Sequence, residues 1–374
     1  MPVVYGLSCK WRGKYKVNMD RYLIDGHKLY WHMDRVLQWQ NERIVAPVYM
    51  EISPVGFCNN RCVFCGVDFA MDNKSRLDAG IFCERLYEMG DLGVRSVMFA
   101  GEGEPLLHED IGSFIRTAKE SGIDVSLTTN GNSGNTALWE DILPYLTWIR
   151  FSVDAGTPQV YSKVHGVKES FFARTIGNIN EAVRIKKQFN LPVTVGVQYL
   201  VVEENAGDIR EAAELFSDMQ IDYYSFKPYS FNPKMLKRRD ESYSDRMLDE
   251  IQGIVDEFKG RSVPEIIFRK QAMQNYMATE KNYNHCNALS FGGYISSQGD
   301  FYTCKEYIGD KRFNAGNIYH CGMKEIFYGE RRRASLKYGM DGLRTDECRR
   351  NCRMARANEF LEMLENKPEH VNFI

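Results

Sequence analysis

Three cysteines close together in the sequence could hold a redox-active metal centre. Cys58, Cys62 and Cys65 follow the pattern C-x3-C-x2-C, directly after a short β-rich run. Three thiolates on one loop can bind three irons of a four-iron cluster, which leaves the fourth iron open to a ligand from outside the protein. Zinc usually takes four closed ligands, commonly as two separated pairs, so this spacing fits zinc poorly. Buried thiols without a metal are the other alternative, and three of them on one loop would be unusual.

A second group of cysteines lies near the end of the chain. Cys286 and Cys304 belong to a C-x12-G-x4-C pattern, and Cys348 and Cys352 follow with three residues between them. Four thiolates from two pairs can close a metal site, so zinc is a fair alternative here on ligand count.

The composition of the chain narrows the class of protein. Its 374 residues allow one large catalytic domain and a smaller one. A formal net charge of −2 marks neither a nucleic-acid binder nor a membrane-surface binder. The first residues lack the apolar stretch of a signal peptide, and no run approaches the roughly 18–20 apolar residues of a membrane-spanning helix. We therefore expect a cytoplasmic protein, whose thiols stay reduced and serve as metal ligands.

Short β-rich runs alternate with amphipathic stretches from residue 48 onward. The expected strands are Val48–Ile52, Ser96–Ala100, Asp124–Thr128, Trp148–Val153, Val193–Leu200 and Tyr223–Lys227. Helices are expected at Asp78–Met89, Ile111–Ser121, Phe172–Lys187, Asp208–Asp218 and Ser244–Phe258. Six strand–helix alternations predict an α/β fold with a parallel sheet, curled into a partial (β/α)6 TIM-type barrel. In such sheets the chemistry lies in the loops at the carboxyl ends of the strands.

Three regions are expected along the chain. Residues 1–46 show no clean period and are interpreted as an irregular extension that packs on the main domain. Residues 47–270 form the barrel. Residues 280–374 form a small, glycine-containing, metal-stapled module that closes with a basic helix from about 349 to 365. Arg349, Arg350 and Arg353 of that helix could bind a phosphate, although a solvated helix face is the commoner case.

The second expected strand ends in a glycine-rich turn that could approach a ligand. Gly101 and Gly103 allow close backbone contact, Glu104 is polar, and Pro105 stops the strand. A dinucleotide-binding motif is excluded because Leu106 occupies the place of its third glycine. A plain turn is the structural alternative.

Other polar residues stand at or near the ends of the expected strands. Asn130, Ser152 and Asp154 would be expensive to bury there unless they bind something, although Asp154 could instead cap the next helix. Weaker candidates for catalysis or substrate contact are Arg150, His165, Gln198, Lys227 and Tyr229.

The first cysteine motif, with Phe64 before its last cysteine, resembles that of the radical SAM superfamily over about residues 47–260. The resemblance implies a [4Fe–4S] cluster on Cys58, Cys62 and Cys65, with S-adenosylmethionine chelating the open iron. An electron, delivered by a flavodoxin- or ferredoxin-type reductant, would then release a 5′-deoxyadenosyl radical. It also implies cofactor contacts, which are the adenine for Phe64, the methionine ammonium for the segment Gly101–Pro105, and the remaining cofactor groups for Asn130, Ser152 and Asp154.

The second cysteine group resembles the auxiliary-cluster modules called SPASM and twitch. Five cysteines without a C-x2-C-x5-C run favour the one-cluster twitch type. The resemblance implies one auxiliary [4Fe–4S] cluster on Cys286, Cys304, Cys348 and Cys352, and leaves Cys321 spare. The spacing of the last pair departs from the family pattern. The overall plan resembles that of the aminocyclitol dehydrogenase of butirosin biosynthesis and its peptide-modifying relatives.

The leading functional hypothesis is an oxidation of a small polar substrate, such as a sugar, an aminocyclitol or a nucleotide-linked sugar. The radical would abstract hydrogen beside a hydroxyl, a base would take the hydroxyl proton, and the auxiliary cluster would take the electron. The alternatives are a peptide or protein maturase, an epimerase with Cys321 or else Cys83 as hydrogen donor, and a non-enzymatic iron–sulfur or zinc protein.

Overall fold

One ten-stranded sheet organises the fold. The computed structural model describes residues 21–22, 27–237, 239–260, 264–278 and 280–373. The order of the strands across the sheet is β10-β9-β8-β1-β2-β3-β4-β5-β6-β7. The strands are β1 (Tyr49–Ile52), β2 (Ser96–Phe99), β3 (Asp124–Thr129), β4 (Trp148–Ser152), β5 (Thr194–Val201), β6 (Tyr223–Pro228), β7 (Glu265–Phe268), β8 (Gly292–Ile295), β9 (Asp300–Tyr302) and β10 (Asn314–Asn317).

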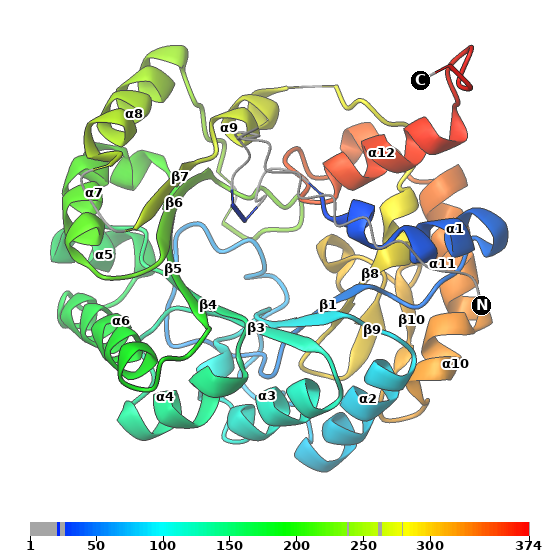
Figure 1. Ribbon diagram of the computed structural model, residues 1–374, viewed down its shortest axis with the longest axis horizontal. Helices are drawn as coiled ribbons and strands as arrows, with labels where there is room; N and C mark the ends of the chain where they lie inside the picture. The colour runs from blue at the N-terminus through cyan, green and yellow to red at the C-terminus, as the bar shows by residue number, and fades with distance from the viewer. Residues whose placement is uncertain (1–20, 23–26, 238, 261–263, 279, 374) are drawn as a thin grey trace, which may run out of the picture.

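The parallel part of the sheet forms an open barrel. Strands β1 to β7 pair in chain order, and β8 adds in parallel to the free side of β1. Figure 1 shows these strands curving around a central space, with helices on the outside. The predicted α/β partial barrel is confirmed, and all six predicted strands are present. Strands β7 and β8 were not predicted, because each is a four-residue run without flanking periodicity.

Helices cover the outer face of the barrel and the hairpin β9–β10 (Figure 1). They are α1 (Met33–Glu42), α2 (Ala79–Asp91), α3 (Ile111–Glu120), α4 (Thr136–Ile142), α5 (Pro158–His165), α6 (Ser170–Gln188), α7 (Ile209–Asp218), α8 (Asp245–Phe258), α9 (Lys270–Met277), α10 (Met323–Tyr328), α11 (Glu330–Asp341) and α12 (Ala355–Glu365). Every described helix is too short or too polar to cross a membrane.

Two predictions about the ends of the chain were wrong. Helix α1 lies within residues 1–46, and its buried Val36 and Trp39 pack with Phe291 and with Phe360 of α12. Tertiary packing, rather than a visible period, therefore forms this helix. Most of the remaining extension lies outside the described residues. Helix α12 begins at Ala355, so the arginines expected on it lie in the preceding loop.

Side chains alternate between two faces along the barrel strands. Apolar side chains such as Phe99 and Phe151 join the main core under the helices. The opposite side chains of these strands face the centre of the barrel, which follows from the two-residue period of a strand, and several of them are polar. They include Glu51, Arg150 and Gln198. A polar interior is costly to build, so it predicts a bound polar partner.

A fully buried arginine joins the start of the barrel to the C-terminal residues. Arg332 of α11 donates hydrogen bonds to the carbonyl oxygens of Val45, Ser290 and Phe327 at 2.7–2.8 Å. Burial lowers the pKa of Arg332 to about 9. No carboxylate pairs with it among the described residues, so carbonyl oxygens supply its hydrogen bonds.

Replacing Arg332 tests this connection. Arg332→Met removes the donors from three buried carbonyls, and we expect it to destabilise the fold by about 3 kcal/mol, roughly 1 kcal/mol for each lost bond. Denaturant unfolding measures the change. The neighbouring Arg333→Met is the matched control, because that side chain is half exposed, and its effect should stay within about 0.5 kcal/mol. Equal effects of the two substitutions would contradict the role given to Arg332.

Candidate active site

The first cysteine group lies on the loop that follows β1, at the carboxyl end of the barrel. Burial raises the pKa of Cys58 to about 12, with Glu104 adding to the shift. Burial also raises the pKa of Cys62 and of Cys65, and the neighbouring thiol charges add to the shift of Cys62. Without a metal, these three partly buried thiols resist ionisation, because their negative charges would repel one another. A metal centre that deprotonates them removes this cost.

Asparagine side chains attach this loop to the loop after β3. Asn130 Nδ2 donates to Asn59 Oδ1 at 2.6 Å and lies 3.7 Å from Cys58 Sγ. Asn132 Nδ2 donates to Asn60 Oδ1 at 2.8 Å. Sequence reasoning identified Asn130 and missed the other three asparagines. Their only signal was the repetition of Asn in both loops, a residue that both donates and accepts hydrogen bonds.

Gly101 and Gly103 pack against the chain that leads into the cysteine loop. A β-carbon on Gly103 would collide with the carbonyl oxygens of Val55 and Phe57, and one on Gly101 with the side chain of Ser53. Gly101 also has a φ of 112°, which favours glycine. Close packing within the chain therefore accounts for both glycines. Their predicted contact with the methionine group stays a prediction.

Glu104 holds the end of β3 and the loop that follows it by hydrogen bonds. Its Oε1 accepts from Thr129 Oγ1 at 2.6 Å, and its Oε2 accepts from the backbone N–H of Asn130 at 2.7 Å. Burial raises the pKa of Glu104, although these bonds oppose the shift. Pro105 begins a single 3₁₀ turn, Pro105–Leu107, as a strand-ending proline should. Glu104 thus orients Asn130, which in turn meets Cys58.

Asp154 and His165 form a buried pair behind Cys62. Asp154 adopts a φ of 54°, and its Oδ1 accepts from the backbone N–H of Leu200 at 2.6 Å. Thr157 precedes α5, so the alternative that Asp154 caps this helix is wrong. His165 Nε2 donates to the carbonyl of Val153 at 2.8 Å, and Nδ1 lies 3.2 Å from Cys62 Sγ. Burial lowers the pKa of His165 to about 4. His165 is 1% exposed, and its predicted contact with substrate or cofactor stays a prediction.

Four other predicted residues lie around this loop or on the inner face. The ring of Phe64 meets the ring of His165 edge-on, with centroids 5.6 Å apart. Ser152, on the inner face of β4, pairs in register with Gln198 of β5 and is partly exposed. Arg150 and Lys227 share this inner face. The contacts expected for Phe64 with the adenine and for Ser152 with the remaining cofactor groups stay predictions.

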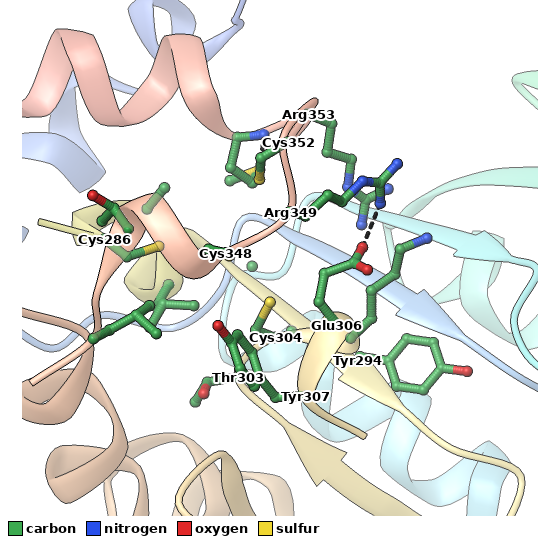
Figure 2. Close-up of a pocket in the computed structure, with 18 of the residues that line it drawn as sticks. Cys286, Tyr294, Thr303, Cys304, Glu306, Tyr307, Cys348, Arg349, Cys352 and Arg353 are labelled. Carbon is green, nitrogen blue, oxygen red and sulfur yellow. Dashed lines mark hydrogen bonds and ion pairs between the residues drawn. The ribbon is translucent and has the colours of Figure 1, made fainter. Parts of the chain in front are cut away.

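The second cysteine group lines one pocket. Cys286, Cys304, Cys348 and Cys352 all contribute to its wall, and Figure 2 shows their side chains around it. Burial raises the pKa of Cys286 to about 12, and the charges of Cys352 and Cys348 add to the shift. Asn358 Nδ2 donates to Cys286 Sγ at 3.6 Å. The chain thus gathers, in one place, the four thiols that its sequence pattern selected.

The spacing of the thiols bears on whether each group would hold a single metal ion or a cluster. Among the described residues, no three His, Cys, Asp or Glu side chains stand close enough to hold one ion. Zinc–sulfur bonds of about 2.3 Å would draw the sulfurs of a site to within about 4 Å of one another. A four-iron cluster places its own core between the sulfurs, so it suits wider spacing. Zinc and iron–sulfur clusters both stay predictions at these two positions.

Cys321 and Cys83, the two cysteines considered as hydrogen donors of an epimerase, lie elsewhere in the structure. Cys321 Sγ lies 3.4 Å from Glu325 of α10, and Arg85 of the outer helix α2 is among the charges that act on it. Cys83 of α2 accepts a hydrogen bond from Thr117 of α3 at 3.5 Å. Neither lines the pocket of the second group or contacts the first loop. This placement does not support a hydrogen-donor role.

The arginines after Cys348 divide between two environments. Arg349 pairs with Glu306 in the pocket (Figure 2), and Arg353, which is 41% exposed, binds the buried Glu51 at 2.8 Å. Arg350 is half exposed and faces Asp240. Arg349 is therefore not part of a solvated surface, whereas Arg350 and Arg353 are both partly exposed.

A glycine substitution tests the packing of the cysteine loop. In Gly103→Ala the new methyl group would push the loop after β1 outward, so we expect loss of the iron held by Cys58, Cys62 and Cys65. Gly177→Ala in α6 is the matched control, because nothing lies within 4 Å of its β-carbon position. Iron analysis after anaerobic reconstitution measures the effect. A full iron content in Gly103→Ala would contradict this account.

Comparison with known proteins gives a consistent result. Residues 52–216 match the Radical SAM superfamily. Over 159 residues the chain is 31% identical to a probable GTP 3',8-cyclase of Thermococcus kodakarensis, covering 41% of this chain and 50% of that protein. Over 103 residues it is 31% identical to the S-adenosylmethionine-dependent nucleotide dehydratase of Lacinutrix mariniflava, covering 26% of this chain and 21% of that protein. The matches thus span half or less of the length of these relatives.

Solved structures share the fold at lower identity. Streptococcus suis SuiB, bound to its precursor peptide SuiA, superposes with a TM-score of 0.65 and 18% identity, covering 92% of this chain and 80% of that chain. The anSMEcpe protein with bound AdoMet gives a TM-score of 0.57 and 16% identity, covering 84% and 88%. Together with the cysteine loop after β1, these findings show that the chain contains a radical SAM domain over residues 52–216.

Proposed function

We propose that the protein is a radical SAM enzyme that oxidises a small polar substrate. When bound, a [4Fe–4S] cluster with S-adenosylmethionine supplies a 5′-deoxyadenosyl radical, and a second cluster supplies an acceptor for one electron. Cys58, Cys62 and Cys65 would hold the first cluster by three irons. A flavodoxin- or ferredoxin-type protein would be the reductant.

The separate pocket of four thiols carries this proposal. Cys286, Cys304, Cys348 and Cys352 can satisfy all four irons of a cluster, so no iron is left open for a substrate. A fully ligated cluster suits electron transfer better than substrate binding. This supports an oxidation with a one-electron acceptor, and the twitch type of module expected from the sequence.

The two thiol groups are linked through the interior of the barrel. Lys305 follows Cys304, and its Nζ lies 3.1 Å from Glu51 Oε1 on β1. Arg353 follows Cys352 and binds the other oxygen of Glu51. Burial opposes ionisation of Glu51, but Lys305 and Arg353 lower its pKa to about 2. The loops of the second group thus reach the strand that precedes Cys58. A substrate held in this interior would lie between the two groups.

Names of the curated relatives support a small, polar substrate. GTP 3',8-cyclases and a nucleotide dehydratase are among them, and a nucleotide-linked substrate agrees with both names. The fold shared with SuiB is compatible with a peptide substrate but does not select one. Epimerisation lacks support, because Cys321 and Cys83 lie among the outer helices.

Removing one ligand of the first group tests the radical chemistry. Reconstituted wild-type protein should bind about eight irons, four for each cluster, and should form 5′-deoxyadenosine when reduced anaerobically with S-adenosylmethionine. Cys62→Ala should abolish 5′-deoxyadenosine formation, since a cluster held by two thiolates would be lost or inactive. Cys321→Ala is the control and should keep both the iron and the product. The proposal fails if Cys62→Ala still cleaves S-adenosylmethionine, or if the wild type binds only about four irons.

Removing a ligand of the second group should have a different effect. Cys286→Ala should lower the iron content by up to about four atoms per chain, yet retain reductive formation of 5′-deoxyadenosine. Metal analysis should find iron, not zinc, in the wild-type pocket. A stoichiometric zinc ion that disappears in Cys286→Ala would instead establish the zinc alternative.

A further inference from the structure

The inner face of the barrel carries basic side chains that lack carboxylate partners. Arg150 of β4 and Lys227 of β6 lie on this face, on either side of β5. Within the described part of the chain, neither forms an ion pair with a carboxylate; Arg150 donates only to Thr128 Oγ1, at 3.2 Å. Polar groups of this kind inside a barrel are expensive unless they are paired.

More cations gather around Lys227. Burial lowers the pKa of Lys227 well below its ordinary value, and the charges of Arg150, Arg269 and Arg349 lower it further. The charges of cations from β4, from the end of β7 and from the Cys348 loop therefore all act on Lys227, and the charge of Asp154 opposes them. An anion there would relieve their mutual repulsion.

Carboxylates near this place do not balance the charge. Glu51 is shared by two cations, Lys305 and Arg353. Glu306 pairs with Arg349 and compensates that charge, so Arg150 and Lys227 are the cations of this set that form no ion pair with a carboxylate within the described residues. Asp154 is fully buried; burial raises its pKa, and the charges of Lys227 and Arg150 oppose that shift.

Unmet hydrogen-bonding groups lie in the same region. Among the described residues, the Nε–H groups of Arg150 and Arg349 are buried without an acceptor, and Gln198 Oε1 is buried without a donor. Gln198 is 6% exposed and lies between the strands of Arg150 and Lys227. Buried polar groups are almost always hydrogen-bonded in native proteins, so these groups indicate a missing ligand.

We propose that Arg150, Lys227 and Arg349 form a subsite for a phosphate group of the substrate. This deepens the proposed function and rests on it. Phosphate carries up to two negative charges and several acceptor oxygens, which suit the planar fork of arginine. A single carboxylate would leave most of the excess charge in place. The shared chemistry is a phosphate ester or anhydride, as in a nucleotide or a sugar phosphate.

Binding of inorganic pyrophosphate to the reconstituted, S-adenosylmethionine-bound protein tests the subsite. Isothermal titration under anaerobic conditions gives the affinity. Lys227→Met and Arg150→Gln should each weaken binding by about tenfold or more, as expected for loss of a charge-assisted hydrogen bond. Lys187→Met and Arg246→Gln are controls with the same charge change on the outer helices α6 and α8, and they should bind like the wild type.

A third variant gives an effect of opposite sign. Glu51→Gln removes the carboxylate that holds Lys305 and Arg353, so it should strengthen pyrophosphate binding. Simple damage to the fold would weaken binding in all the barrel variants alike. Comparing UDP with glucose 1-phosphate then distinguishes a nucleotide source of the phosphate from a sugar phosphate.

Two results would overturn the subsite. One is a wild-type protein that forms 5′-deoxyadenosine but does not bind pyrophosphate, or binds it equally in the Lys227 and Arg150 variants. The other is a matching loss of S-adenosylmethionine affinity in those variants, which would assign the cations to the carboxylate of that cofactor. Absence of 5′-deoxyadenosine from the wild type would instead count against the proposed function itself.

Discussion

A buried thiol ionises only when a positive centre compensates for the lost water, and this constraint governs both cysteine groups. Burial is the main cause of the raised pKa of Cys62 and of Cys304, and neighbouring thiols add to it. Metal coordination reverses this balance, because a bound cation deprotonates its thiol ligands. The loops around the thiols are accordingly held by protein contacts that do not depend on the metal, such as Asn130 beside Cys58 and Asn358 beside Cys286.

The cost of burying a charge also applies to the barrel interior between the two cysteine groups. A sheet closed by helices on its outside leaves its inner face away from bulk water, where charges are costly. Glu51 meets this cost by binding Lys305 and Arg353, which also ties the second cysteine group to β1. Strand β8 strengthens the tie, because it pairs with β1 within the same sheet. A boundary between the barrel and the C-terminal module was expected between residues 270 and 280. It stays a prediction, because the sheet continues across it.

Much of the fold could be predicted because its signals are local. The β-rich runs that became β1 to β6 each show as apolar segments, and the three-cysteine motif identifies itself by spacing. Other features depend on partners far away in the sequence. Helix α1 forms through the packing of Trp39 against Phe291, and β8 forms through pairing with β1. Nothing in the sequence predicted that His165 would contact Cys62. Nor did it predict that Asp154 would accept a hydrogen bond from Leu200 rather than cap a helix.

The proposed function requires two chemically different clusters, one open and one closed. Electron paramagnetic resonance of the reduced, reconstituted protein tests it most directly. We expect two [4Fe–4S]⁺ signals, of which S-adenosylmethionine shifts only the one that Cys62→Ala removes. The signal that Cys286→Ala removes should be insensitive to S-adenosylmethionine. A single signal, or a shift of both signals by S-adenosylmethionine, would contradict the account.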